Sequence, residues 1–141
     1  MKHRVILDTG PLVALLDQRD AHHRWAVRQW GDIAPPLISC EAVISEACFL
    51  LDQTREGSAG VLEMLRRHVV VIGLRLDAHV DEIDRLRRKY ADVPMSVADA
   101  CLVRLAEQLG QSAVLTLDDD FAVYRKHGRQ VIARIAPGPT R

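Results

Sequence analysis

Cysteine is scarce in this sequence of 141 residues, and Cys40, Cys48 and Cys101 show no Cys-x-x-Cys spacing. Zinc ribbons and disulfide frameworks require cysteines at regular spacings, so the sequence argues against both. Long apolar runs are also missing, which argues against a membrane-spanning helix. The apolar stretch Val5–Leu7 is too short for the core of a signal peptide. We therefore expect a cytoplasmic protein.

An excess of charge of either sign is absent as well. The 19 Lys and Arg residues balance 19 Asp and Glu residues. This balance excludes a globally cationic nucleic-acid binder and an acidic solvating tail, although it leaves room for local patches. With 48% hydrophobic residues, the chain has enough apolar material for one domain of ordinary size. We expect that domain over residues 1–136 and a flexible tail over residues 137–141.

Several well-known motifs of catalysis are missing. The chain has no Gly-x-x-x-x-Gly-Lys loop and no Gly-x-Gly-x-x-Gly fingerprint, so nucleotide-cofactor folds lack support. Its serines lack the surroundings of a nucleophile elbow. The triad Asp8-Thr9-Gly10 also occurs in aspartic proteases, but that all-β fold needs two such triads. Here a single triad is followed by Pro11 and a helical pattern, which argues against a protease.

Strand-like and helix-like segments alternate along the chain. Strands that are apolar throughout and separated by helices indicate a parallel sheet covered on both faces. The expected strands are Val5–Leu7, Leu37–Ser39, Val69–Ile72, Ala113–Leu117 and Gln130–Ile135. Helices are expected over Leu12–Leu16, from His22 to Trp30, over Glu41–Gln53, from Val61, from a cap at Asp77 to Tyr90, over Ser96–Leu109 and over Phe121–His127.

Two aspartates come directly after predicted strands. Asp8 follows Val5–Leu7, and Asp118 follows Ala113–Leu117. In an open parallel sheet, the groups just beyond the carboxyl ends of the strands line the ligand crevice. The two aspartates can therefore meet at one edge of the sheet.

Two further acids lie inside predicted helices on faces that are largely apolar. At about 100° per residue, Glu46 shares its face with Phe49 and Leu50. Asp99 lies roughly 130° from the centre of its helix's polar stripe, and its neighbours on the helix are apolar. We therefore expect Asp99 to face inward. The stripe consists of Arg104, Glu107 and Gln108, and the apolar neighbours are Leu102, Val103 and Ala106.

Each of these acids also has a structural explanation. Ser96-x-x-Asp99 resembles a capping box, Asp118 can cap the helix that follows, and Asp8 can open a turn. Taken together the acids are harder to explain, because two carboxylates about 4 Å apart repel by about 4 kcal/mol at an effective dielectric of about 20. They must protonate or bind a cation. An all-oxygen acidic site suits Mg²⁺ or Mn²⁺ rather than zinc.

Four short motifs contain these acids: Leu7–Leu12, Ser45–Ala47, Pro94–Ala100 and Thr116–Phe121. Their order and spacing along nearly the whole chain resemble the PIN-domain ribonucleases, and most closely the VapC-type toxins of bacterial toxin–antitoxin pairs. The resemblance implies an α/β fold, a three-layer αβα sandwich with a short, mainly parallel sheet. It also implies an Mg²⁺-dependent endoribonuclease.

Carried over to this chain, the resemblance gives an acidic quartet of Asp8, Glu46, Asp99 and Asp118. Three aspartates follow one another at 118–120, and Asp118 is preferred because it fits the pattern Thr-x-Asp-x-x-Phe. Asp8 and Asp99 are the expected primary ligands of Mg²⁺, with Mn²⁺ as the alternative. The other two acids would position water, the outer shell of the metal or a second ion. Thr9 and Thr116 can hydrogen-bond to the carboxylates.

The resemblance further implies an RNA substrate, a cognate antitoxin and a homodimer. The two tryptophans and the apolar helix faces of the first half are compatible with interfaces. Candidate phosphate contacts are Arg66-Arg67, the basic run from Arg85 to Lys89, and Arg125-Lys126 with Arg129. The middle run is more typical of an ordinary solvated helix face, and Arg125 and Lys126 are favoured because they follow the acidic run. Two alternatives stay open: a stand-alone RNA-maturation nuclease without an antitoxin, and a non-catalytic PIN-like interaction module.

Overall fold

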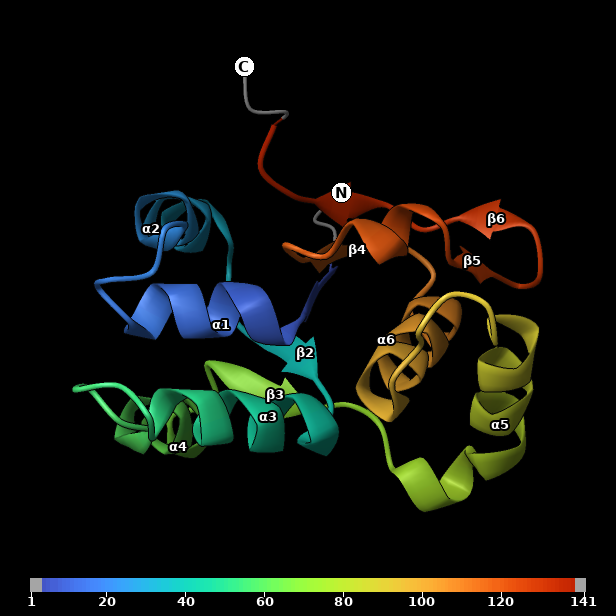
Figure 1. The fold of residues 1–141 in the computed structure, drawn as a ribbon, viewed down its shortest axis with the longest axis horizontal. Coiled ribbons are helices and arrows are strands. Elements are labelled where there is room, and N and C mark those ends of the chain that lie inside the picture. Colours follow the sequence, from blue (N-terminus) through green and yellow to red (C-terminus); the bar gives the residue numbers. More distant parts are fainter. Residues whose placement is uncertain (1–3, 139–141) are drawn as a thin grey trace.

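Five short strands form one parallel sheet in the computed structural model, which describes residues 4–138 (Figure 1). The strands lie in the order β3-β2-β1-β4-β7, and every neighbouring pair is parallel. Their bounds are Arg4–Leu7 for β1, Leu37–Ser39 for β2, Val70–Ile72 for β3, Ser112–Leu115 for β4 and Arg134–Ile135 for β7. The predicted parallel sheet is therefore confirmed.

Helices cover both faces of this sheet and complete the three layers (Figure 1). Alternate strand residues enter two separate cores, since Ile6 packs in one cluster while Val5 and Leu7 pack in the other. Helices α5 and α6 contribute to the first cluster, α1 and α4 to the second, and α3 to both. The helices are α1 (Thr9–Leu16), α2 (His23–Asp32), α3 (Glu41–Leu51), α4 (Ala59–Arg66), α5 (Val80–Lys89) and α6 (Val97–Gln108).

The strand order places the reversal of the chain path between β1 and β4. From β1 the chain moves outward through β2 and β3, and it then returns through α5 and α6 to β4 on the other side of β1. Leu7 and Leu115 are register partners, and the Asp8 amide donates to the Leu115 carbonyl at 3.1 Å. Ligands of open parallel sheets bind at this kind of reversal, beyond the carboxyl ends of the strands.

The C-terminal part of the chain differs from the prediction. The helix expected over Phe121–His127 is only a short 3₁₀ helix, η2 (Asp119–Ala122), followed by β5 (Arg125–Lys126). The strand expected over Gln130–Ile135 is divided into β6 (Gln130–Val131), which pairs with β5 in an antiparallel hairpin, and β7. The hairpin turns at His127 and Gly128, where φ is 51° and 82°. Both predictions were wrong because these elements are too short to carry a periodic pattern.

Smaller differences concern one cap and the tail. Asp77 does not cap α5; it lies in a short 3₁₀ helix, η1 (Leu76–Ala78), and its carboxylate pairs with Arg75 at 2.8 Å. The residue directly before α5 is His79. Of the tail expected over residues 137–141, residues 139–141 lie outside the described part. No helix within residues 4–138 is long and apolar enough to cross a membrane.

Candidate active site

Asp8 lies between β1 and α1 and is 7% exposed. Its side chain caps α1 by accepting a hydrogen bond from the Thr9 amide at 2.8 Å. The other carboxylate oxygen accepts from the Thr116 hydroxyl at 2.7 Å. Asp8 therefore has a structural role as the cap of α1, and its second oxygen is held against the end of the neighbouring strand.

Asp99 lies in the first turn of α6 and is half-buried. It forms the predicted capping box: the Ser96 hydroxyl accepts from the Asp99 amide at 3.0 Å, and the Ser96 amide donates to Asp99 Oδ2 at 3.3 Å. The Tyr124 hydroxyl also donates to Asp99 Oδ2, at 3.3 Å. The carboxylate thus combines a structural role with the predicted inward orientation.

Asp118 follows β4 and is half-buried. Its amide donates to the Thr116 hydroxyl at 2.9 Å, so the hydroxyl that holds Asp8 also positions Asp118. The Asp118 carboxylate accepts from the Asp120 amide at 2.9 Å and caps η2. The adjacent Asp119 side chain is fully exposed and lies 3.8 Å from Arg134.

Glu46 does not lie on a buried face, which corrects the expectation from helical periodicity. It is exposed, as are Phe49 at 67% and Leu50 at 39%. Helix α3 buries a different stripe, formed by Val43, Ala47 and Leu51. The Glu46 carboxylate nevertheless reaches the start of α1, where it accepts from the Thr9 hydroxyl at 3.2 Å.

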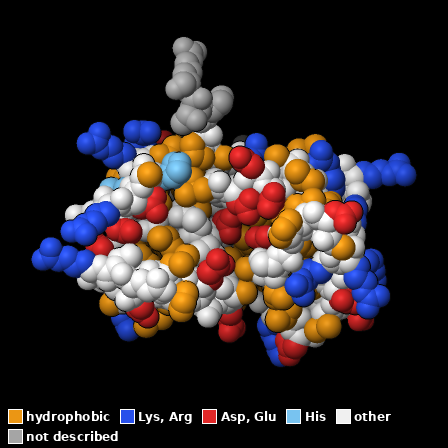
Figure 2. All heavy atoms as spheres, in the orientation of Figure 1, with side chains coloured by type: hydrophobic (Ala, Val, Ile, Leu, Met, Phe, Trp, Pro, Cys, Tyr) orange, Lys and Arg blue, Asp and Glu red, His pale blue; other side chains and the backbone are white. Residues whose placement is uncertain are grey.

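All four predicted acids line one cleft of about 440 Å³ at the reversal of the chain path. Asp8 and Asp118 come from the ends of the two central strands, Asp99 from the start of α6, and Glu46 from the rim formed by α3. Figure 2 shows acidic side chains gathered in a hollow near the middle of the face in view. Asp119 and Asp120 do not line the cleft, so the structure favours Asp118 as the fourth acid.

Comparison with known proteins places the chain in a family. The model of the PIN domain family matches residues 5–127. The chain belongs to the PIN-domain family. This PIN domain is 28% identical over 120 residues to Ribonuclease VapC26 of Mycobacterium tuberculosis (strain ATCC 25618 / H37Rv), covering 81% of this chain and 86% of that protein.

The fold of this PIN domain is also similar to that of a solved structure. The match is to Mycobacterium tuberculosis VapC20, described as a toxin that cleaves the sarcin-ricin loop, with a TM-score of 0.74 and 22% sequence identity. It covers 84% of this chain and 93% of the VapC20 chain. The predicted resemblance to VapC-type proteins is confirmed.

Two carboxylates of the cleft, those of Asp8 and Asp99, have raised pKa values and hold protons more tightly than ordinary carboxylates do. Burial raises the pKa of Asp8 from 3.8 to about 6, and the charges of Asp99 and Asp118 raise it further against the opposing hydrogen bonds from Thr116 and Thr9. Burial also raises the pKa of Asp99, and the Asp118 charge acts in the same direction. Negative charge is therefore concentrated in the cleft, and a bound cation would reduce the repulsion between the carboxylates.

The donor set fits a magnesium ion. Within residues 4–138, no three His, Cys, Asp or Glu side chains are arranged closely enough to hold a metal ion directly. Mg²⁺ does not need three, because it retains several waters and is commonly held by one or two carboxylates. Asp8 and Asp99 both line the cleft, and the charge of Asp99 raises the pKa of Asp8, so two carboxylates are available to such an ion.

The raised pKa of Asp8 predicts that the metal-free PIN domain is more stable in weak acid. Folding raises this pKa from 3.8 to about 6, so at pH values between these two the folded protein keeps a proton on Asp8 that the unfolded chain has lost. The contribution of Asp8 to stability is therefore full below pH 3.8 and is lost as the pH rises through 6. The shift corresponds to at most about 3 kcal/mol. We expect the free energy of unfolding in EDTA, relative to Asp8→Asn, to fall between about pH 3.8 and about pH 6 and to level off above that. Urea titrations that show no such difference would contradict the shift.

One residue of the site was missed by the sequence. Tyr124 is fully buried, donates to the Asp99 carboxylate and stacks edge-on against Phe121 with ring centroids 5.2 Å apart. Burial raises the pKa of its hydroxyl, with the charge of Asp99 acting in the same direction, so the group stays a proton donor at neutral pH. The only signal for Tyr124 in the sequence is its spacing of three residues from Phe121, and an ordinary helix would show the same spacing.

Proposed function

We propose that this PIN domain is an Mg²⁺-dependent endoribonuclease that hydrolyses RNA phosphodiester bonds and acts as the toxin of a toxin–antitoxin pair. The observation that carries the proposal is the convergence of Asp8, Glu46, Asp99 and Asp118 on one cleft at the reversal of the chain path. The names of its relatives, a ribonuclease and an RNA-cleaving toxin, support the same chemistry.

In this proposal Asp8 and Asp99 hold the ion, with Mn²⁺ as an alternative to Mg²⁺. When bound, the ion polarises the phosphodiester and lowers the pKa of an attacking water. The chain itself keeps the two ligands in place, because Thr116 donates to Asp8 and Tyr124 donates to Asp99. These hydrogen bonds orient the carboxylates in advance, and no His or Lys side chain is required as a base.

Glu46 and Asp118 take the outer positions of the proposed site. Glu46 lies on the rim and is tied to α1 through Thr9, so it can orient a water at the entrance. Asp118 shares the Thr116 hydroxyl with Asp8, which fixes it beside the first ligand. Both can bind the outer shell of the metal or a second ion.

The proposed partners are the RNA substrate, a cognate antitoxin and a second copy of this chain, in the cytoplasm. Trp25 and Trp30 are partly buried and pack against the core, so each offers only part of its side chain to such contacts. Exposed apolar side chains on the same half of the molecule are Val27, Phe49, Leu50 and Leu62. They supply the kind of surface that protein interfaces bury.

The test is cleavage of single-stranded RNA by the purified protein. We expect cleavage in Mg²⁺ or Mn²⁺, background levels in EDTA, and recovery when excess Mg²⁺ is added back. Full cleavage in excess EDTA would refute the metal mechanism. No cleavage of any RNA with either ion would refute the nuclease and favour a non-catalytic interaction module. A small protein that co-purifies and inhibits cleavage separates a toxin from a stand-alone RNA-maturation nuclease.

A further inference from the structure

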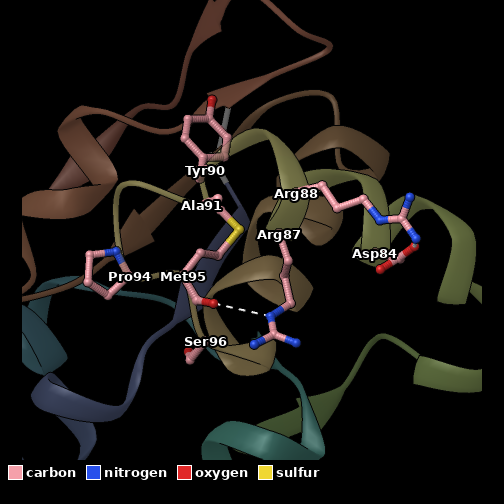
Figure 3. A pocket seen from close by; sticks show the side chains of 8 residues that line it. All are labelled: Asp84, Arg87, Arg88, Tyr90, Ala91, Pro94, Met95 and Ser96. Atoms are coloured by element: carbon pink, nitrogen blue, oxygen red, sulfur yellow. Dashed lines mark hydrogen bonds and ion pairs between the residues drawn. The ribbon is translucent and has the colours of Figure 1, made fainter.

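A second cleft, of about 650 Å³, opens beside the acidic one (Figure 3). It lies between the C-terminal end of α5 and the segment that leads into α6, and Arg87 and Met95 help to line it. Ser96 lines both clefts, so the two are neighbours. The volume is within the range of about 300–1,000 Å³ that ligand pockets commonly have.

Arg87 is the cation that this cleft presents. Its Nε donates to the Met95 carbonyl at 3.2 Å, and Figure 3 shows the guanidinium extending from α5 toward Met95 and Ser96. The side chain is exposed, and within residues 4–138 neither of its Nη groups has a hydrogen-bond acceptor or a carboxylate partner. One contact thus fixes the direction of the guanidinium, while its remaining donors stay available.

Several of the other basic residues singled out in the sequence have partners within the fold, whereas in the described part of the chain the side chains of Arg85 and Lys126 have none. Arg88, on the same helix turn, pairs with Asp84 at 3.0 Å. Arg125, the candidate favoured by the sequence, donates through Nη1 to three backbone carbonyls of its own segment, and it stays a candidate phosphate contact. Arg66 and Arg67 both pair with Glu63.

The geometry points to an RNA-backbone subsite, in which Arg87 binds a phosphate adjacent to the scissile one on a strand that passes from the acidic cleft over Ser96. This inference rests on the proposed function and adds the path of the substrate. RNA needs local cations here, because the chain has no net charge and its candidate active site is lined by carboxylates. A guanidinium binds two phosphate oxygens in a bidentate manner, and the two Nη groups of Arg87 are sufficient for this.

Arg87→Ala tests the subsite, with Arg85→Ala as the control of equal charge. Arg85 lies two residues away, about 200° around α5 by helical geometry, and lines a different cleft with Glu82 and Leu86. We expect Arg87→Ala to raise the KM for a short single-stranded RNA about tenfold, with kcat within about twofold. Arg85→Ala is expected to change neither constant appreciably.

RNA binding, measured by fluorescence anisotropy in EDTA, distinguishes a phosphate contact of Arg87 from a merely structural role of this residue. The slope of log K against log salt concentration should be smaller in magnitude by about 0.7 in Arg87→Ala and unchanged in Arg85→Ala. Arg87→Lys keeps the charge and loses the Met95 contact, so it should recover most of the slope. Equal slopes in the two alanine variants, or a lysine variant that binds as poorly as Arg87→Ala, would overturn the subsite.

The outcomes also separate this inference from the proposed function. A wild-type protein that binds RNA through Arg87 but cleaves none refutes the nuclease and leaves the subsite standing. A wild-type protein that cleaves RNA equally well with and without Arg87 refutes only the subsite. A wild-type protein that neither binds nor cleaves RNA refutes both.

Discussion

Asp99→Asn and Asp8→Asn are each expected to lower the rate of RNA cleavage about thousandfold, which corresponds to about 4 kcal/mol of transition-state stabilisation. Each change removes one of the two charges that would hold the ion and leaves the side chain's size unchanged. In Asp99→Asn one oxygen can accept both existing hydrogen bonds, because those from the Ser96 amide and the Tyr124 hydroxyl end on the same oxygen, Oδ2. In Asp8→Asn the oxygen can accept from the Thr9 amide, and the Thr116 hydroxyl can accept from the new amide nitrogen instead of donating. Rates are to be measured at saturating Mg²⁺ with a labelled RNA.

The same variants should fold at least as well as the wild type without metal, because carboxylate repulsion in the cleft is reduced. Asp119→Asn is the matched control, since it removes the same charge from a fully exposed side chain outside the cleft. We expect it to retain activity within a few-fold. Full activity in Asp99→Asn would remove Asp99 from the proposed metal site, and an unfolded Asp8→Asn would show that capping, not catalysis, is its main role.

Phe121→Ala is expected to destabilise the protein by about 3–5 kcal/mol, a large part of the stability of an ordinary domain. Phe121 is fully buried and packs in the same cluster as Tyr124 and Ile83. Its removal leaves a cavity directly behind the loop that carries Asp118. Urea unfolding measures the loss.

Val123→Ala serves as the control for this change. It lies two residues further along, and its side chain is 49% exposed, so a change of at most about 0.5 kcal/mol is expected. A loss below about 1 kcal/mol in Phe121→Ala would mean that the loop after β4 is held by its hydrogen bonds and not by its packing.

The central part of the fold was predictable because each strand there is short, apolar and bounded by a helix. The strand Leu37–Ser39 was predicted with its observed bounds. The orientation of Asp99 followed from helical geometry, because α6 is long enough to show a clear polar stripe. The meeting of Asp8 and Asp118 followed from the rule that strand ends of a parallel sheet form the crevice.

The remaining features depend on contacts that no local pattern encodes. Glu46 was placed on a buried face because Phe49 and Leu50 are apolar, yet α3 turns a different stripe toward the core. Tyr124 donates to Asp99 from a segment where η2 has already ended at Ala122 and the predicted helix does not continue. The hydrogen bonds from Arg125 Nη1 to three nearby backbone carbonyls could likewise not be predicted from its place after the acidic run.

The central strand of the sheet is also the first one to be synthesised. Arg4–Leu7 pairs with Ser112–Leu115, and the hydroxyl that fixes Asp8 belongs to a residue 108 positions later in the chain. A ribosome extends a chain by about 5–20 residues per second, so several seconds pass between the synthesis of Asp8 and that of Thr116. Closing so long a loop also slows folding itself. The acidic cleft therefore comes together only after residue 118 has been synthesised, and a chain released before that point lacks one of its aspartates.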